Sequence, residues 1–469
     1  MPAGTGSPRG APIAPPAPVA SDPTLPLGAI RACLEGAVPA MMATSDEDSV
    51  PNVAYISQVY YVDERHVALS FQFFNKTRQN ILVRPWATVL VIDPHSATFY
   101  RLQLRYLRTE TEGALFEGMK AQLAGIASHS GMAGVFQLRG SDVYEVREIE
   151  RVPGDPLPLP PARAGLLGAV RRASERLARA TALDDALNAV LSTLADHLGM
   201  RHAMVLMLDA ATGRLYTVAS CGYATSGVGS EIEMGDGVIG VAAREQTPVR
   251  IMHMTNAYLY SHAIRRSLRA DEPELALATD IPYPGLPEPH SQLAVPVLSA
   301  GRLLGVLFAE SPQDMQFSYE DEDALVAIAG HLGAAMDLMQ AGAETAEPAA
   351  PATALPTEAA GVPLVVRRYP ANDSVFIDGT YLIKGVAGAI FWKLLGDHAA
   401  QGRTEFTNRE LRLDPAIRLP DVADNLEARL VLLQRRLAEH GPHIRIEKTG
   451  RGRFRLAVMR PVELAEVAG

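Results

Sequence analysis

The sequence predicts a multidomain α+β protein with three folded parts, and three observations lead to this expectation. The chain has 469 residues, more than one ordinary hydrophobic core accommodates. Runs rich in Pro and Ala interrupt it, as linkers do. Between them the hydrophobic pattern changes from period-two alternation to helical spacing. We therefore divide the chain into a disordered tail, three domains and two linkers, at residues 1–28, 29–152, 165–340 and 363–461, with linkers at 153–164 and 341–362.

The amino-acid composition is that of a globular protein. Hydrophobic residues make up 48% of the chain and charged residues 20%, and the net charge is −10; these values are typical of globular proteins. Cys33 and Cys221 lie in different expected domains and form no CxxC pair, so neither a disulfide framework nor a zinc site is expected. No apolar run of about 18 residues is free of charge. We expect a cytoplasmic protein without a membrane span or a bound metal.

The first domain is expected to be a small β-barrel. The runs "NVAYISQVYYVD" and "HVALSFQFF" alternate with period two around the turn "DERH". "WATVLVIDP", "TFYRLQLRYLRTE" and "DVYEVREIERV" continue the strands, and only "GALFEGMKAQLAGIA" has helical spacing. Many strands with few helices favour a barrel.

A run of basic and short polar side chains in this domain is a candidate phosphate site. Lys76, Thr77 and Arg78 stand together after a strand, in the run "NKTRQN", and Asn80 is placed to hold the loop. A dianionic phosphate needs fixed positive charge and short donors in one small space. The same run is also compatible with a solvated turn.

These segments resemble the pyridoxamine-phosphate-oxidase-like, flavin-binding split barrels. The resemblance rests on Met41–Ser45, Pro51–Ser57 and residues 75–80, with Pro85 beyond. It implies FMN, with its ring against the strand near Ala43 to Asp46. The candidate cofactor-binding residues are Ala43, Thr44, Ser45, Lys76, Thr77, Arg78 and Asn80.

The kind of cofactor stays open at this point. Related barrels bind FAD, deazaflavin or haem, so another flavin or haem is an alternative to FMN. His95 and His129 are the candidate haem ligands, although a lone histidine is more often a surface residue.

The second domain is expected to have a helix–sheet–helix order. An apolar stripe runs through residues 166–198, five strands follow, and Ser318 with acidic residues after it marks the start of a last helix. The segments "GDGVIGVAAREQTPVRI" and "SQLAVPVLSAGRLLGVLFAES" resemble the GAF family of small-molecule sensors. That resemblance implies a ligand between the sheet and an inserted loop.

The insertion, at about residues 256–290, is long enough to form a lid or a contact surface. Its candidate contact residues are Tyr258, Tyr260, His262, Arg265, Arg266, Tyr283 and His290. Cys221 is followed by Gly222 and matches no chromophore-attachment pattern, which disfavours a bilin. A tetrapyrrole, a cyclic nucleotide, or dimerisation without any ligand remain alternatives. We expect a homodimer through the helices at residues 166–198 and 321–340.

The third domain combines helices with a β-hairpin that is expected to turn at Thr449–Gly450. "FTNRELRLDP", "DNLEARLVLLQRRL" and "IRIEKTGRGRFRL" resemble the winged-helix effector domains of OmpR/PhoB-type response regulators. Leu426, Leu430, Leu433 and Leu437 recur at helical spacing and are expected to form a buried stripe.

The resemblance implies that the outer face of this helix enters the major groove of DNA while the hairpin contacts phosphates. The candidate DNA-binding residues are Asn425, Arg429, Arg435, Arg436, Lys448, Arg451 and Arg453. Val431 and Leu432 depart from the polar pattern of such helices and would suit a protein contact instead.

The sequence thus predicts a sensor-regulator in which a flavin-type barrel and a GAF domain control a DNA-binding module. Two alternatives remain: an FMN-dependent oxidoreductase with regulatory domains, and a scaffold that binds protein. No pattern of paired carboxylates or of nucleophile and base identifies a catalytic residue.

Overall fold

The computed structural model describes most of the chain, in ten segments: residues 25–34, 40–56, 58–72, 76–129, 138–158, 165–252, 281–344, 361–417, 419 and 426–467. Residues 1–24 of the expected tail and much of both expected linkers lie outside this part. The chain divides into two compact units. The first comprises Met1–Leu69, Phe74–Arg108 and Asp142–Leu159, and the second comprises Ser70–Phe73, Thr109–Ser141 and Pro160–Gly469.

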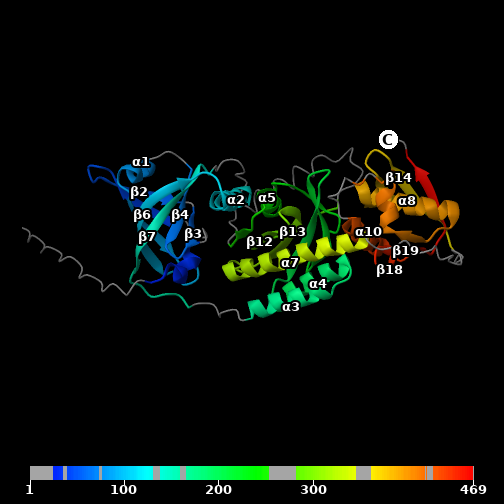
Figure 1. Ribbon diagram of the computed structural model, residues 1–469, viewed down its shortest axis with the longest axis horizontal. Helices are drawn as coiled ribbons and strands as arrows, with labels where there is room; N and C mark the ends of the chain where they lie inside the picture. The colour runs from blue at the N-terminus through cyan, green and yellow to red at the C-terminus, as the bar shows by residue number, and fades with distance from the viewer. Residues whose placement is uncertain are drawn as a thin grey trace, which may run out of the picture. The chain divides into compact units, whose positions relative to one another are not determined.

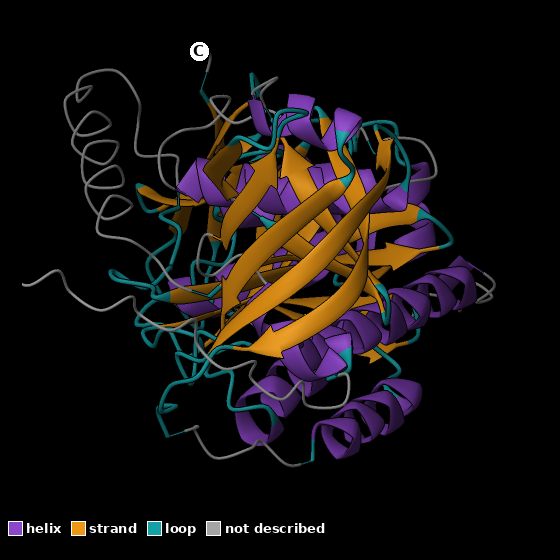
Figure 2. Ribbon diagram, turned by 90° about the vertical axis from the view of Figure 1, so that its left-hand side faces the viewer, coloured by secondary structure: helices purple, strands orange, loops and turns teal. Residues whose placement is uncertain are grey.

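The first unit is built on a seven-stranded sheet with the strand order β2-β1-β5-β6-β7-β4-β3, whose strands stand in front in Figure 2. Its elements are the 3-10 helix η1 (Leu27–Leu34), β1 (Ala40–Ser45), β2 (Pro51–Ile56), β3 (Val59–Asp63), β4 (His66–Phe71), α1 (Lys76–Val83), β5 (Trp86–Ile92), β6 (Phe99–Glu110) and β7 (Gly140–Arg151). Alternate residues of β1, β5 and β6 point into one core that includes Met42, Val89 and Leu102. The period-two pattern therefore has the expected cause, a sheet with one buried face.

Two sequence expectations differ from the structure here. The run expected to be one strand over "NVAYISQVYYVD" is divided into β2 and β3, which lie at opposite edges of the sheet. Alternation continues through both strands, and it carries no information about where a strand changes its partner. Leu27, assigned to the tail, is in η1 and is buried in the core.

The second unit contains a six-stranded sheet in the order β10-β9-β8-β13-β12-β11. Its elements are α3 (Leu166–Arg179), α4 (Leu183–His197), β8 (His202–Asp209), β9 (Arg214–Cys221), β10 (Glu231–Glu233), α5 (Gly237–Glu245), β11 (Val249–Ile251), β12 (Ser291–Ser299), β13 (Arg302–Ser311) and α7 (Tyr319–Glu344). In Figure 1, α3, α4 and α7 lie together along the sheet, and α5 lies apart from them.

The two faces of this sheet bury separate cores. Val205, Leu307 and Val295 pack with α3, α4 and α7, whereas Met204 and Phe308 pack with α5. The helix α2 (Ala114–His129), which follows β6 in the chain, also packs on α5 and β11. The expected cap of α7 is confirmed: the Asp321 amide donates to Ser318 Oγ (3.3 Å), and the Ser318 amide donates to the Asp321 carboxylate (2.9 Å).

The C-terminal module follows in the same unit. Its elements are β14 (Leu364–Tyr369), β15 (Ser374–Ile377), β16 (Thr380–Ile383), α8 (Gly385–Gln401), β17 (Glu405–Thr407), α9 (Asn408–Leu413), α10 (Leu426–His440), β18 (Ile444–Gly450), β19 (Arg453–Val458) and β20 (Val462–Glu466). β16-β15-β14-β20 form one sheet and β17-β19-β18 another.

The hairpin of β18 and β19 turns two residues later than expected. Gly450 pairs with Arg453, so the turn consists of Arg451 and Gly452. Gly452 has a φ of 64°, a left-handed conformation that glycine adopts without steric cost, whereas Gly450 is the last residue of β18. The expectation of a turn at Thr449–Gly450 is therefore wrong.

Candidate functional site

The candidate phosphate residues lie in the first turn of α1. Lys76 Nζ is 3.2 Å from the Asp46 carboxylate, and Asn52 donates to Thr77 Oγ1 at 2.9 Å. The amide N–H groups of the first helical turn have no partner inside the helix, and an anion at such a terminus gains from the helix dipole. The strand-end position expected for these residues is thus the start of a helix.

Arg78 is the most enclosed cation of this group. Its guanidinium donates to the carboxylate of Asp142 on β7 and lies 5.7 Å from the ring of Tyr106. The two side chains of the pair are only 12% and 7% exposed. Burial by itself lowers the pKa of Arg78, but the hydrogen bond and charge of Asp142 outweigh it and raise that pKa above its ordinary value. Arg78 is therefore held by an internal anion.

The candidate residues of β1 are divided between the two faces of the sheet. Thr44 points inward and accepts a hydrogen bond from Asn80 Nδ2 at 3.1 Å. Ala43 and Ser45 lie on the opposite face, where Ala43 pairs with Val53 of β2. That face carries exposed apolar side chains, namely Met41, Val53, Tyr55 and Trp86. This apolar surface is opposite to the face on which Thr77 and Asn80 of α1 contact Asn52 and Thr44.

The candidate haem ligands receive no support from a ligand cluster. The amide of His95 donates to Asp93 in a turn, and the side chain of His129 lies outside the described residues. Within the described part of the chain, no group of three or more His, Cys, Asp or Glu side chains could hold a metal ion.

A buried carboxylate lies in the six-stranded sheet. Glu310 on β13 is 2% exposed and accepts hydrogen bonds from the Leu286 amide (2.8 Å) and Gln292 Nε2 (3.0 Å). Burial raises the pKa of Glu310, although these donors oppose the shift. The Tyr223 side chain faces the same carboxylate, and burial raises its pKa as well. A single Glu inside the apolar run "VLFAES" was the sequence signal for this group, and our sequence analysis missed it.

The structure describes some of the other candidate residues of this sheet domain. His290 Nδ1 lies 3.3 Å from the Asp314 carboxylate. Burial raises the pKa of the Cys221 thiol, which makes it less reactive. Tyr258, Tyr260, His262, Arg265 and Arg266 lie outside the described residues.

Helix α10 is covered on nearly all sides. The expected stripe is confirmed, because Leu426, Leu430, Leu433 and Leu437 are at most 9% exposed. The expected outer face is covered too: Arg429, Val431 and Leu432 are 5%, 8% and 4% exposed. The reason is that this face packs against β9 and α4 of the preceding sheet domain. Asn425 lies outside the described residues.

Acidic residues of the sheet domain meet the arginines of α10. Arg429 lies 3.2 Å from the Asp209 carboxylate and 4.2 Å from the centre of the Tyr216 ring. Arg435 donates to Asp184 (2.5 Å) and to Asn188 (2.9 Å) on α4.

Further contacts extend the interface beyond these two arginines. Glu439 of α10 is bonded to Ser226, and Lys384 pairs with Glu231 at 3.2 Å. Arg436 is held mainly within its own module, by the Leu382 carbonyl (3.0 Å) and by Glu439 (2.7 Å).

The hairpin differs from the helix. Lys448 and Arg451 are exposed, and Arg453 is half-buried. Lys448 and Arg451 lie near Glu427 at the start of α10, and their charges oppose the rise that burial causes in the pKa of Glu427. The expected set of cations is thus divided into an exposed hairpin and a covered helix.

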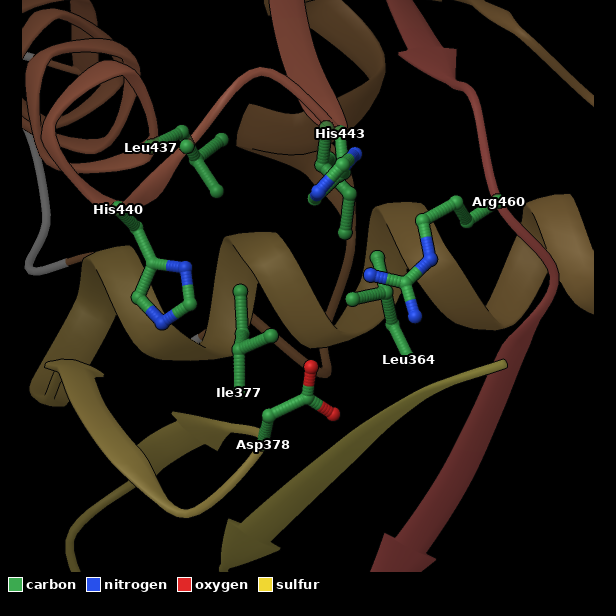
Figure 3. A pocket seen from close by; sticks show the side chains of 9 residues that line it. Leu364, Ile377, Asp378, Leu437, His440, His443 and Arg460 are labelled. Atoms are coloured by element: carbon green, nitrogen blue, oxygen red, sulfur yellow. The ribbon is translucent and has the colours of Figure 1, made fainter. Parts of the chain in front are cut away.

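A small cavity of about 220 Å³ lies between the end of α10 and the sheet of β14 and β15. Figure 3 shows the Arg460 guanidinium and the Asp378 carboxylate directed toward its middle. Both are bonded to backbone, Arg460 to the Val362 carbonyl and Asp378 to the Val365 amide. His440 Nε2 is buried there, and none of the residues that the structure describes forms a hydrogen bond with it. A cavity of this size with such a group has room for ordered water.

Comparison with known families identifies the first two of the three expected domains. The family model described as pyridoxamine 5'-phosphate oxidase matches residues 27–147, and the GAF domain model matches residues 182–336. The chain carries a pyridoxamine 5'-phosphate oxidase-like domain followed by a GAF domain. The predicted resemblances to these two families are therefore confirmed. The winged-helix resemblance of the C-terminal module stays a prediction.

Three solved structures illustrate the similarity. The GAF domain of a phosphoenolpyruvate-protein phosphotransferase from Acinetobacter is 21% identical, with 38% of this chain and 97% of that chain covered (TM-score 0.31). The free methionine-R-sulfoxide reductase of Neisseria meningitidis is 19% identical, with 40% and 96% covered (TM-score 0.30). An FMN-binding protein from Syntrophomonas wolfei is 17% identical, with 27% and 86% covered (TM-score 0.24). No curated protein matches the chain significantly.

The two matched domains indicate a sensory or regulatory protein. None of the helices within the described part of the chain combines the length and hydrophobicity of a membrane-spanning segment.

Proposed function

We propose that the protein is a cytoplasmic transcriptional regulator in which the oxidase-like and GAF domains sense a flavin or another small molecule and control a C-terminal DNA-binding winged helix. The observation that carries this proposal is the order of elements in the C-terminal module. A sheet and α8 precede the helices α9 and α10, and a β-hairpin with exposed Lys448 and Arg451 follows. Helix, helix and basic hairpin are the parts that such modules use on DNA.

DNA binding is tested by the salt dependence of affinity for a mixed-sequence duplex. Each phosphate contact contributes about −0.9 to the slope of log K against log salt. The variant Lys448→Ala/Arg451→Ala should therefore reduce the slope by about 2 and leave sequence preference largely intact. The matched control is Arg171→Ala/Arg179→Ala, which removes two exposed cations from α3 and should leave the slope unchanged. Equal slopes for both variants would refute a hairpin contact with DNA.

Within this proposal the oxidase-like domain binds FMN. Lys76 and the N-terminus of α1 would hold the phosphate, with Arg78 behind them, and the exposed apolar face near Ala43 and Tyr55 would carry the ring. Haem or another flavin is the alternative, and the visible spectrum distinguishes haem from a flavin.

Flavin binding is tested by titration and by the visible spectrum of the purified protein. Lys76→Ala should weaken FMN binding by about 1.5–3 kcal/mol, the range for a hydrogen bond to a charged group. Riboflavin is the matched control, since it has the same ring and no phosphate, and its affinity should not change. A protein that takes up neither flavin would contradict the proposal.

Two further parts of the proposal concern partners. The homodimer expected through the GAF helices is supported by exposed apolar side chains on α3 and α7, Leu167, Val326 and Leu338, and light scattering tests it. A scaffold function was suggested by Val431 and Leu432, but both side chains are covered inside the chain. The oxidoreductase alternative is supported by the match of residues 27–147 to the oxidase family model.

A further inference from the structure

The interface between α10 and the GAF domain uses the same cations that DNA binding would require. A recognition helix reads DNA only when one of its faces is open to the major groove. Here Arg429 is 5% exposed, and the side chains of Arg435 and Arg436 are 20% and 16% exposed. While the interface is closed, Arg429 and Arg435 are paired with Asp209 and Asp184, whereas Arg436 is held mainly by its own module.

The acidic groups across the interface carry the same sign of charge as DNA phosphates. Asp209 and Asp184 each present a carboxylate to one arginine, as a DNA backbone would. Tyr216 adds a ring face under the Arg429 guanidinium. Glu231 extends the acidic surface to Lys384, which lies at the start of α8. The GAF surface thus contacts α10 both through opposite charges and through apolar packing.

The contact is also suited to opening. Several of its ion pairs lie at the rim, where Asp184 is 37% exposed, and partly exposed pairs contribute modestly to stability. Opening the contact would expose the arginines together with Val431 and Leu432, which belong to the same apolar cluster as the GAF helices. A ligand that favours one arrangement of the GAF domain can therefore change the occupancy of the closed state.

We propose that the GAF surface formed by Asp184, Asp209 and Tyr216 is an intramolecular competitor of duplex DNA for α10. This rests on the proposed DNA-binding function and adds its regulation. In the closed state the exposed hairpin remains accessible to DNA while Arg429 and Arg435 are covered, so binding is weak and independent of sequence. Opening the interface releases Arg429 and Arg435 and permits tight binding.

The test measures the affinity of the full chain for a mixed-sequence duplex at low salt. The variant Asp184→Asn/Asp209→Asn keeps side-chain size and leaves an acceptor for the Ala211 amide that Asp209 holds. It should bind DNA about tenfold more tightly than the unmodified chain, because the apparent affinity rises with the fraction of open molecules. The matched control is Asp185→Asn, the exposed neighbour of Asp184 in the first turn of α4, which should bind as the unmodified chain does.

Hydrogen exchange of α10 provides the second measurement. Exchange should be faster in the double variant than in the unmodified chain and the control, since the helix loses its cover more often. If the double variant is poorly folded, Glu231→Gln replaces it. Glu231 pairs with Lys384 and not with an arginine of α10. Its substitution should therefore change DNA affinity and hydrogen exchange in the same direction, by a smaller factor.

The possible outcomes separate this inference from the proposed function. Equally tight DNA binding by the unmodified chain and the double variant would overturn the competition and leave the DNA-binding function standing. No detectable binding by any of the proteins would overturn both. Tighter binding by both aspartate variants, control included, would show a general charge effect and refute the specific interface.

Discussion

Arg78 and Arg429 are both buried arginines that meet an aspartate, yet they belong to different kinds of contact. Arg78 pairs with Asp142 inside the oxidase-like domain, with side-chain exposures of 12% and 7%. Arg429 pairs with Asp209 between the C-terminal module and the GAF domain, with exposures of 6% and 17%. The first pair can separate only if its domain loosens, whereas the second can separate when two folded domains move apart.

The two ion pairs differ in what the loss of one partner costs. Removing one partner of a buried pair leaves an uncompensated charge, which is costly when water cannot reach it. At a domain interface that cost is limited by the free energy of docking, because undocking rehydrates the charge. A cation is thus structural when its anion belongs to the same domain, and releasable when its anion belongs to a neighbouring domain.

The largest expected effect is at the structural pair. Asp142→Ala should lower the free energy of unfolding of the oxidase-like domain by about 3–5 kcal/mol, because Arg78 is left buried without its anion. Urea unfolding is followed by Trp86 fluorescence in a Trp392→Phe background, since the chain has two tryptophans. Glu148→Ala, an exposed acid on the same strand, should change stability by less than about 0.5 kcal/mol. Similar losses for both variants would mean that the Arg78 pair is not structural.

A smaller effect is expected at the interface pair. Asp209→Ala should cost about 1–3 kcal/mol, because Arg429 loses the carboxylate with which it forms an ion pair, and the loss should not exceed the free energy of docking. Trp392 in α8 reports this loss, while the Trp86 transition should stay unchanged. Asp185→Ala serves as the exposed control. A loss as large as that of Asp142→Ala would show that the two kinds of contact do not differ.

The smallest effect concerns a buried charge with no cation paired to it among the described residues. Burial raises the pKa of Glu310, so the unfolded chain ionises first as pH rises above about 4.5. Wild-type stability should therefore fall relative to Glu310→Gln as pH rises from that value toward neutrality, and the difference should no longer change with pH below it. Melting temperatures from pH 4 to 8 check this. A variant that is less stable than the wild type at neutral pH would indicate that the Glu310 hydrogen bonds outweigh its burial.

Much of the local structure followed from the sequence pattern. The strands β8, β9, β12 and β13 and the helices α2 and α7 form where alternation or helical spacing predicts them. The Ser318 cap also forms as expected, because it involves residues three positions apart. Two local predictions were wrong. The sequence pattern did not show that β2 and β3 pair with different strands, and it placed the hairpin turn at Gly450, whereas the glycine with positive φ is Gly452.

The sequence by itself determined the order of the domains, the positions of most helices and strands, and the buried stripe of α10, because each depends on residues a few positions apart. Only the tertiary structure decided which anion each cation meets. Arg78 and Asp142 are 64 positions apart, and Arg435 and Asp184 are 251 apart. Periodicity reports which face of an element is apolar and carries no information about a partner so distant. The candidate arginines of α10 were assigned to DNA because the segment resembles a winged helix, while packing of the folded chain placed Arg429 and Arg435 against the GAF domain.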